Sequence, residues 1–211
     1  MNVLVSVVAA ALTFFLVSKG RRNTVVTASL ISTNILVYLM FSDGITTYSW
    51  FIYRWGDSLM NVLNGNPWVL VTACFIHVNV VHILMNMYAL YIFGEVLEPH
   101  LGGWKFFTLY MVAGIVGNIF SSLLDPFSVG VGASGAILGL FGYLIAYEYK
   151  MSGRISVSSA LIAIFVIAGG FMPDVDILAH LGGFLTGAIC GVVSMRRTTR
   201  SYQVAYYYSY E

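Results

Sequence analysis

Residues 132–148 read GASGAILGLFGYLIAYE, and residues 177–195 read ILAHLGGFLTGAICGVVSM. Both stretches are apolar and approach the roughly 20 residues that a helix needs to cross a bilayer. Each also carries one chemically active residue near its start, Ser134 in the first and His180 in the second. Polar and titratable groups are costly inside a membrane, so their presence there indicates function. The two stretches therefore predict a reactive centre between two membrane helices.

The composition predicts a multi-pass membrane protein. Of 211 residues, 59% are hydrophobic and only 9% are charged, whereas soluble domains are charged at roughly 25% of positions. The net charge of +1 and the lack of a basic tract give no sign of nucleic-acid binding. We predict an all-α polytopic fold whose apolar segments fall at about 2–17, 25–41, 80–97, 105–124, 134–148, 155–171 and 177–195.

The charges between these segments predict the orientation of the chain. Basic loops stay in the cytoplasm, and the basic residues follow alternate segments: Lys19, Arg21, Arg22, Lys105, Lys150, Arg154, Arg196, Arg197 and Arg200. The other loops are mostly acidic, with Arg54 as the exception. We therefore expect a cytoplasmic C-terminus and an external, aromatic-rich first loop at 43–79 that forms an interfacial hairpin or a re-entrant segment. The plasma membrane of a prokaryote is the expected location.

Three regions are predicted along the chain. Residues 1–23 form a hydrophobic anchor helix followed by a basic cytoplasmic linker, although residues 2–17 are short enough to be a frayed or interfacial segment instead. Residues 24–200 form a core of six membrane helices. Residues 201–211 form a tyrosine-rich cytoplasmic tail, for which the sequence suggests no chemistry.

Helices of the same direction bring several polar residues to one depth. Ser134 and His180 each precede the next cytoplasmic basic residue by 16 positions, which places both about 24 Å above the inner charges. His82 and Asn86 lie one turn apart near the outer end of a third helix, so they share a face. We expect these four side chains to meet in one pocket.

Their chemistry suits acyl transfer. A serine hydroxyl needs a base, and a neutral imidazole can take its proton near pH 7. His82, Asn86 and the backbone N–H of Ser134 are candidate donors to an oxyanion. Asp176 precedes His180 by one turn and is a candidate third member, but a Ser-His dyad is the preferred interpretation. His77 is off the face of His82 and is interpreted as a loop anchor.

The glycines favour close helix contact. Small residues that recur every four positions let helix backbones approach one another in lipid. On a helical wheel, one such stripe lies on the histidine side of its helix, and a second borders the serine. The two stripes comprise Gly183, Gly187 and Gly191, and Gly135, Gly139 and Gly142.

Taken together, these motifs resemble the rhomboid intramembrane serine proteases over about residues 24–195. The resemblance is specific because of the order and spacing of the motifs, namely Trp68, His77-x4-His82-x3-Asn86, Gly94-x3-Glu98, Gly132-Ala133-Ser134-Gly135 and Ala179-His180-x2-Gly183-x3-Gly187. It implies a six-helix bundle with a membrane-associated first loop and one extra N-terminal helix here. It also implies that Ser134 is the nucleophile, His180 the base, and His82 and Asn86 oxyanion donors.

The resemblance further implies that Glu98 braces the inner end of its helix, with His77, Gly132, Gly135, Gly183 and Gly187 as structural support. Two positions depart from the family pattern. Val69 replaces an arginine that often follows the tryptophan, and Leu138 replaces an aromatic residue that commonly stacks on the base. Neither departure removes a reacting group, so the expected effect is on loop bracing and on rate.

The predicted function is endoproteolysis of single-span membrane proteins near the outer face of the bilayer. The expected partners are those substrates and membrane lipid, and no metal or organic cofactor is expected. A non-catalytic relative that binds or escorts membrane helices is the alternative, although such a protein has no use for both Ser134 and His180. A proton-coupled transporter is less favoured, because paired intramembrane carboxylates are missing from the sequence.

Overall fold

The computed structural model describes residues 24–169 and 175–194. In this part of the chain the regular elements are helices, accompanied by three isolated β-bridges. The six longest helices are α2 (Val25–Phe41), α6 (Val80–Leu101), α7 (Gly103–Leu124), α8 (Ser134–Ser152), α9 (Val157–Gly169) and α10 (Ile177–Ser194). Each begins within two residues of a predicted apolar segment. The predicted anchor helix in residues 1–23 and the tail at 201–211 lie outside the described residues.

The all-helical prediction is confirmed for these residues. The helices α6, α7 and α10 are long and apolar enough to cross a membrane, and α2 is a shorter apolar helix. Their lipid-type surface is evident from exposed side chains such as Leu84, Tyr88, Leu185 and Ile189. A soluble protein would not leave so many large apolar side chains uncovered. The number of spanning helices stays a prediction.

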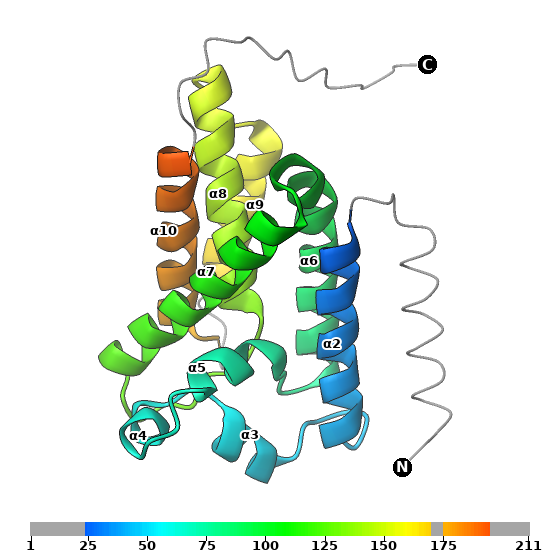
Figure 1. Ribbon diagram of the computed structural model, residues 1–211, viewed down its shortest axis with the longest axis vertical. Coiled ribbons are helices and arrows are strands. Elements are labelled where there is room, and N and C mark those ends of the chain that lie inside the picture. The colour runs from blue at the N-terminus through cyan, green and yellow to red at the C-terminus, as the bar shows by residue number, and fades with distance from the viewer. Residues whose placement is uncertain (1–23, 170–174, 195–211) are drawn as a thin grey trace.

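The helices α7, α8 and α10 form the tightest group in the bundle (Figure 1). Gly183 of α10 lies against the backbone of Gly135 in α8, and Gly187 lies against the backbone of Gly139. A Cβ at either position of α10 would overlap the opposing carbonyl group. We call these four glycines the glycine seam. Because no side chain separates the two helices there, main-chain contact fixes their spacing.

The helix α2 runs beside α6 and is attached to its C-terminal part (Figure 1). The buried carboxyl group of Glu98 accepts hydrogen bonds from the backbone N–H groups of Val26 and Thr27 at 2.8 and 2.7 Å. It also accepts one from the Thr27 hydroxyl at 2.6 Å. The first N–H groups of a helix have no partner within the helix. Glu98 therefore satisfies the start of α2 while it joins the two helices.

The predicted loop at 43–79 contains short helices and lies at the end of the bundle where α6, α8 and α10 begin (Figure 1). They are α3 (Ser49–Trp55), α4 (Leu59–Leu63), α5 (Val69–Thr72) and the 3₁₀ turn η1 (Ala73–Phe75). Phe51 of α3 stacks on Phe41 at the end of α2, with ring centroids 3.8 Å apart. Asp57 exchanges two backbone hydrogen bonds of 2.8 Å with Gly130. The first contact ties the loop to the end of α2, and the second ties it to the segment that precedes α8.

Candidate active site

Ser134 is the first residue of α8, and the chain reaches it through an unusual turn. Gly132 has φ of +134°, a conformation that side-chain-bearing residues rarely adopt. A Cβ at Gly132 would also lie 2.9 Å from the imidazole of His82 and 3.5 Å from the Ser134 hydroxyl. Glycine is therefore required for both backbone conformation and space. The turn presents the Ser134 hydroxyl at the helix start.

His180 lies in the first turn of α10, on the face toward α8. Its Nε2 atom is 2.8 Å from the Oγ atom of Ser134, within hydrogen-bonding distance. The glycine seam begins next to this pair, since Gly135 follows Ser134, Gly183 lies three residues after His180, and the two glycines are in contact. Two residues that are 46 positions apart are thus brought together by the backbone packing of their helices.

The pair opens into a groove of about 640 Å³. His82 and Asn86 line this groove together with Ser134 and His180, so the four predicted side chains share one cavity. Apolar residues line much of the remainder, including Val80, Val81 and Met85. Such a groove has room for an extended polypeptide segment beside the reacting pair.

The two candidate oxyanion donors are linked to each other. The side-chain amide of Asn86 donates to the backbone carbonyl of His82 at 2.9 Å, which orients the amide in the groove. A primary amide has two N–H donors, so one remains for a ligand. The backbone N–H of Ser134 lies in the first turn of α8, where helix geometry leaves it without an intrahelical acceptor. These groups border the same space as the Ser134 hydroxyl.

His77 supports the turn that carries the serine. Its Nε2 atom accepts a long hydrogen bond of 3.4 Å from the backbone N–H of Ala133, and its ring contacts that of His82 edge-on at 5.0 Å. Burial lowers the pKa of His77 to about 3, with a further contribution from His82. The imidazole is therefore neutral at physiological pH, and its lone pair is free to accept. His77 contacts the turn before Ser134 and is not among the residues that line the groove, so its role as a loop anchor stays a prediction.

Within the described residues, the carboxyl group of Asp176 forms no hydrogen bond with the imidazole of His180. Its carboxyl group accepts from the backbone N–H of Ala179 at 2.9 Å and from the Ser121 hydroxyl at 2.6 Å. Asp176 thus caps α10 and joins it to α7. The backbone carbonyl of Asp176 also accepts from the backbone N–H of His180 at 3.1 Å, so its contact with His180 is through the main chain.

The remaining predicted residues lie away from the groove. Glu98 bonds the start of α2, near the opposite end of α6. Leu138 and Val69 are buried in the protein interior. Among the described side chains, those of residues 24–164 and 175–194, no aromatic ring contacts His180, in keeping with leucine at position 138.

Sequence reasoning missed a group of residues beside the groove. Asp57, Ser121, Ser122 and Gly130 come together with Asp176 at the start of α10. They are brought together from four separate parts of the chain, and no local spacing signals their contact. Asp57 is an acidic residue of the first loop whose burial is known only from the structure.

Comparison with known proteins places this site in a family. The model of the rhomboid domain matches residues 64–197. "RHOMBOID-like protein 6, mitochondrial" of Arabidopsis thaliana is 37% identical over 141 residues, which cover 63% of this chain and 45% of the relative. YdcA of Bacillus subtilis (strain 168), named provisionally as a rhomboid protease, is 32% identical over 160 residues, covering 69% of this chain and 80% of the relative.

"Rhomboid-like protease 3" of Toxoplasma gondii is 33% identical over 132 residues, which cover 59% of this chain and 50% of the relative. The chain spans less than half the length of two of the Arabidopsis thaliana relatives that it matches. The matched region nevertheless contains Ser134, His180, His82 and Asn86, whereas Ile45 and Thr46, which also line the groove, precede it. Multi-pass membrane insertion follows from the family and from the apolar helices together. The chain belongs to the rhomboid family.

Proposed function

We propose that this protein is an intramembrane serine endopeptidase that uses Ser134 and His180 as a catalytic dyad. The observation that carries the proposal is the 2.8 Å contact between Ser134 Oγ and His180 Nε2, at the wall of a groove that has room for a peptide. A hydroxyl and an imidazole in contact are the minimum equipment for nucleophilic acyl transfer. Membership of a family that includes named proteases supports the same reading.

The first half of the reaction forms an acyl-enzyme. The Ser134 oxygen attacks the carbonyl carbon of the scissile peptide, and its proton moves to Nε2 of His180. The carbonyl oxygen becomes an oxyanion, which accepts from the Ser134 backbone N–H, the free amide N–H of Asn86 and the His82 imidazole. The positive end of the α8 dipole faces the same position. Collapse of the intermediate transfers the Nε2 proton to the leaving amine.

The second half repeats the sequence with water. His180 takes a proton from a water molecule that enters the groove, and the resulting hydroxide attacks the ester carbonyl. The same donors hold the second oxyanion. Collapse releases the carboxylic acid product and returns the proton to the Ser134 oxygen, so the enzyme is restored.

The proposed substrates are single-span membrane proteins. The groove lies between membrane-type helices, which restricts entry to segments that reach it from the bilayer or its surface. A helix that contains small or helix-destabilising residues is the expected substrate, because the scissile carbonyl must leave its intrahelical hydrogen bond. The distribution of basic loops supports cleavage near the outer face.

The proposal is tested in liposomes that contain the purified protein and a single-span reporter. We expect Ser134→Ala to abolish cleavage while leaving thermal unfolding unchanged, because the hydroxyl is the nucleophile. The control is Ser29→Ala, the same substitution on the exposed face of α2, where the hydroxyl only bonds the backbone of its own helix. This variant should cleave at the wild-type rate.

Cleavage by Ser134→Ala at the wild-type rate would exclude the serine mechanism. Binding of the reporter by a wild-type protein that never cleaves any single-span segment would instead support a non-catalytic relative. A fluorophosphonate probe gives an independent measurement, since it should label wild type and fail to label His180→Ala.

A further inference from the structure

Asp57 is a buried carboxyl group that joins the first loop to the start of α8. Its side chain is only 2% exposed, and it accepts a hydrogen bond from the Ser122 hydroxyl of α7 at 2.8 Å. Its backbone exchanges two hydrogen bonds with Gly130, four residues before Ser134. Any movement of Asp57 is therefore transmitted to the turn that carries the nucleophile.

Asp176 in the same way holds the start of α10, the helix that carries His180. It accepts from Ser121, the neighbour of Ser122 on α7, and from the first turn of α10. The backbone N–H of His180 also donates to the Asp176 carbonyl at 3.1 Å. The position of Asp176 thus sets the position of the turn that contains His180.

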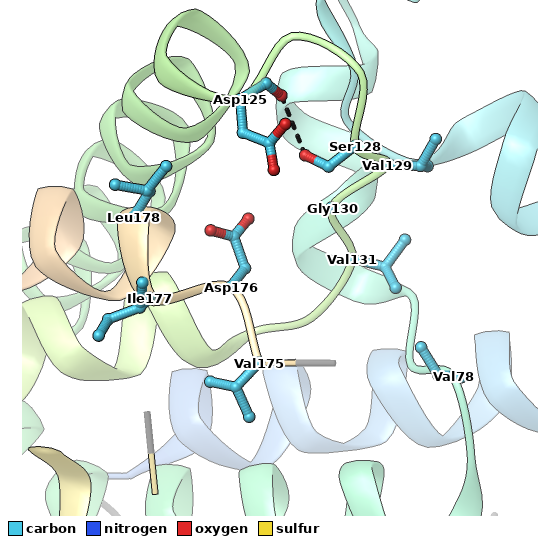
Figure 2. Close-up of a pocket in the computed structure, with 10 residues that line it drawn as sticks. All are labelled: Val78, Asp125, Ser128, Val129, Gly130, Val131, Val175, Asp176, Ile177 and Leu178. Carbon is cyan, nitrogen blue, oxygen red and sulfur yellow. Dashed lines mark hydrogen bonds between the residues drawn. The ribbon is translucent and has the colours of Figure 1, made fainter. Parts of the chain in front are cut away.

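The two carboxyl groups converge on Gly130. A Cβ on that glycine would stand 3.1 Å from an oxygen of Asp176 and 3.8 Å from an oxygen of Asp57. Figure 2 shows the Asp176 carboxyl group beside Gly130, within a cavity of about 510 Å³ that Asp125 faces from the other side. Asp176 lines both this cavity and the groove of the dyad.

Within residues 24–169 and 175–194, no lysine or arginine forms a hydrogen bond with either carboxyl group, and the titratable group that faces Asp176 from α10 is His180. Arg54 is the nearest basic residue in sequence to Asp57, but its side chain reaches Asn66 at 3.5 Å and lies over the ring of Trp55. The other titratable groups that face Asp57 are Asp176 and the buried Cys74 thiol. Burial raises the pKa of Cys74 to about 12, so the thiol stays neutral and adds no negative charge beside Asp57. Two ionised carboxylates here would repel one another in a region of low dielectric constant.

We propose that Asp57 and Asp176 act as a positioning pair that holds one proton, and that this proton keeps the Ser134 turn and the His180 helix in register. The serine hydroxyls satisfy one oxygen of each carboxyl group, and the proton removes one of the two charges. When it leaves to solvent, repulsion across Gly130 pushes the loop and the helix apart. Since Ser134 and His180 must stay in contact, the rate then falls.

The direction of the pH effect follows from the chemistry. Burial is the main cause that raises the pKa of Asp57 to about 7; the Ser122 hydrogen bond opposes this rise, and the Asp176 charge contributes to it. The proton is present below that value and is lost above it. The structural effect should therefore appear as a fall in rate on the alkaline side, separate from the acid limb caused by protonation of His180.

The test compares pH profiles of reporter cleavage for wild type, Asp57→Asn and Asp176→Asn. An asparagine has the shape of the protonated acid and cannot ionise, so either substitution removes the repulsion. We expect the alkaline fall to be present in wild type and absent in both variants, with Asp57→Asn within about twofold of the wild-type rate below the fall. Asp125→Asn is the matched control on the same cavity and should keep the wild-type profile.

A second measurement does not depend on the proposed function. In the Ser134→Ala background, infrared difference spectra between acid and alkaline pH should show a protonated-carboxyl band that titrates near neutral pH. Substitution of Asp57 by asparagine should remove it. Loss of the band in that variant supports the pair even if no reporter is ever cleaved.

Three results would overturn the inference. The first is an Asp57→Asn or Asp176→Asn profile that superimposes on the wild-type profile. The second is a titrating band that survives the Asp57 substitution. The third is a folded Asp57→Asn protein that is inactive at every pH, because a neutral side chain of the same shape should preserve the register.

Discussion

Replacement of Glu98 should separate α2 from α6. The carboxyl group makes three hydrogen bonds to the start of α2, at 2.8, 2.7 and 2.6 Å, and two of these are fully buried. Glu98→Ala removes all three acceptors and leaves the N–H groups of Val26 and Thr27 without a partner. An unsatisfied buried donor costs about 1–3 kcal/mol. The two buried bonds therefore predict a loss of about 2–6 kcal/mol in the free energy of unfolding.

Glu98→Gln should be milder, for a geometric reason. One oxygen of Glu98 serves both groups of Thr27, and the other serves Val26. A glutamine can turn its remaining oxygen toward Thr27 and keep two of the three bonds, so only the partly buried bond to Val26 is lost. We expect a cost of about 1–2 kcal/mol, below that of alanine.

Equilibrium unfolding in mixed detergent micelles measures both variants. The control is Glu95→Ala, which makes the same change one turn earlier on α6, where the side chain is half-buried and bonds nothing on α2 in the described structure. This variant should change stability by less than about 0.5 kcal/mol. An alanine variant at Glu98 that is as stable as the Glu95 control, or a glutamine variant less stable than alanine, would refute the reasoning.

Two further predictions concern the groove and the glycine seam. Asn86→Ala and Asn86→Asp both lack an amide donor, so each should lower kcat by about 10²–10³ with an unchanged unfolding midpoint; a change below threefold in the liposome assay would remove Asn86 from the oxyanion donors. Gly187→Ala inserts a methyl group against the backbone of Gly139 and should destabilise the protein by about 1–3 kcal/mol. Its unfolding midpoint should fall together with its kcat, and a fall in neither would contradict the close backbone packing.

Much of the helical architecture could be predicted from the sequence. The apolar segments at 25–41 and 177–195 match α2 and α10 closely, because apolar runs bounded by charges or glycines have few alternatives in a membrane protein. The segment at 134–148 predicts the start of α8, which continues four residues further, to Ser152. The helix α6 continues four residues past the predicted end, to Leu101. Pro99 lies in its last turn, and Gly102, with φ of +79°, ends it. The predicted segment ended at residue 97, before Pro99, whereas α6 accommodates this proline in its last turn.

The meeting of Ser134 and His180 was also predictable, since both positions were counted from charges that mark the same membrane surface. Their catalytic roles stay a proposal. The first loop was less accessible to such reasoning, because its four short helices lack a sustained period. The carboxyl pair was not predictable, since Asp57 and Asp176 belong to elements 119 positions apart in the chain that meet only through the fold.

The main-chain contact between α8 and α10 has a consequence for how this protein tolerates change. An ordinary core absorbs an enlarged residue when its neighbours adopt other rotamers, but Gly183 and Gly187 face carbonyl groups, which have no rotamers. Relief is possible only if whole helices shift, and that shift carries the imidazole away from the hydroxyl. At the glycine seam, the same substitutions should therefore lower both the stability of the fold and the rate of cleavage. A second substitution that compensates for one of them should restore both stability and rate, or neither.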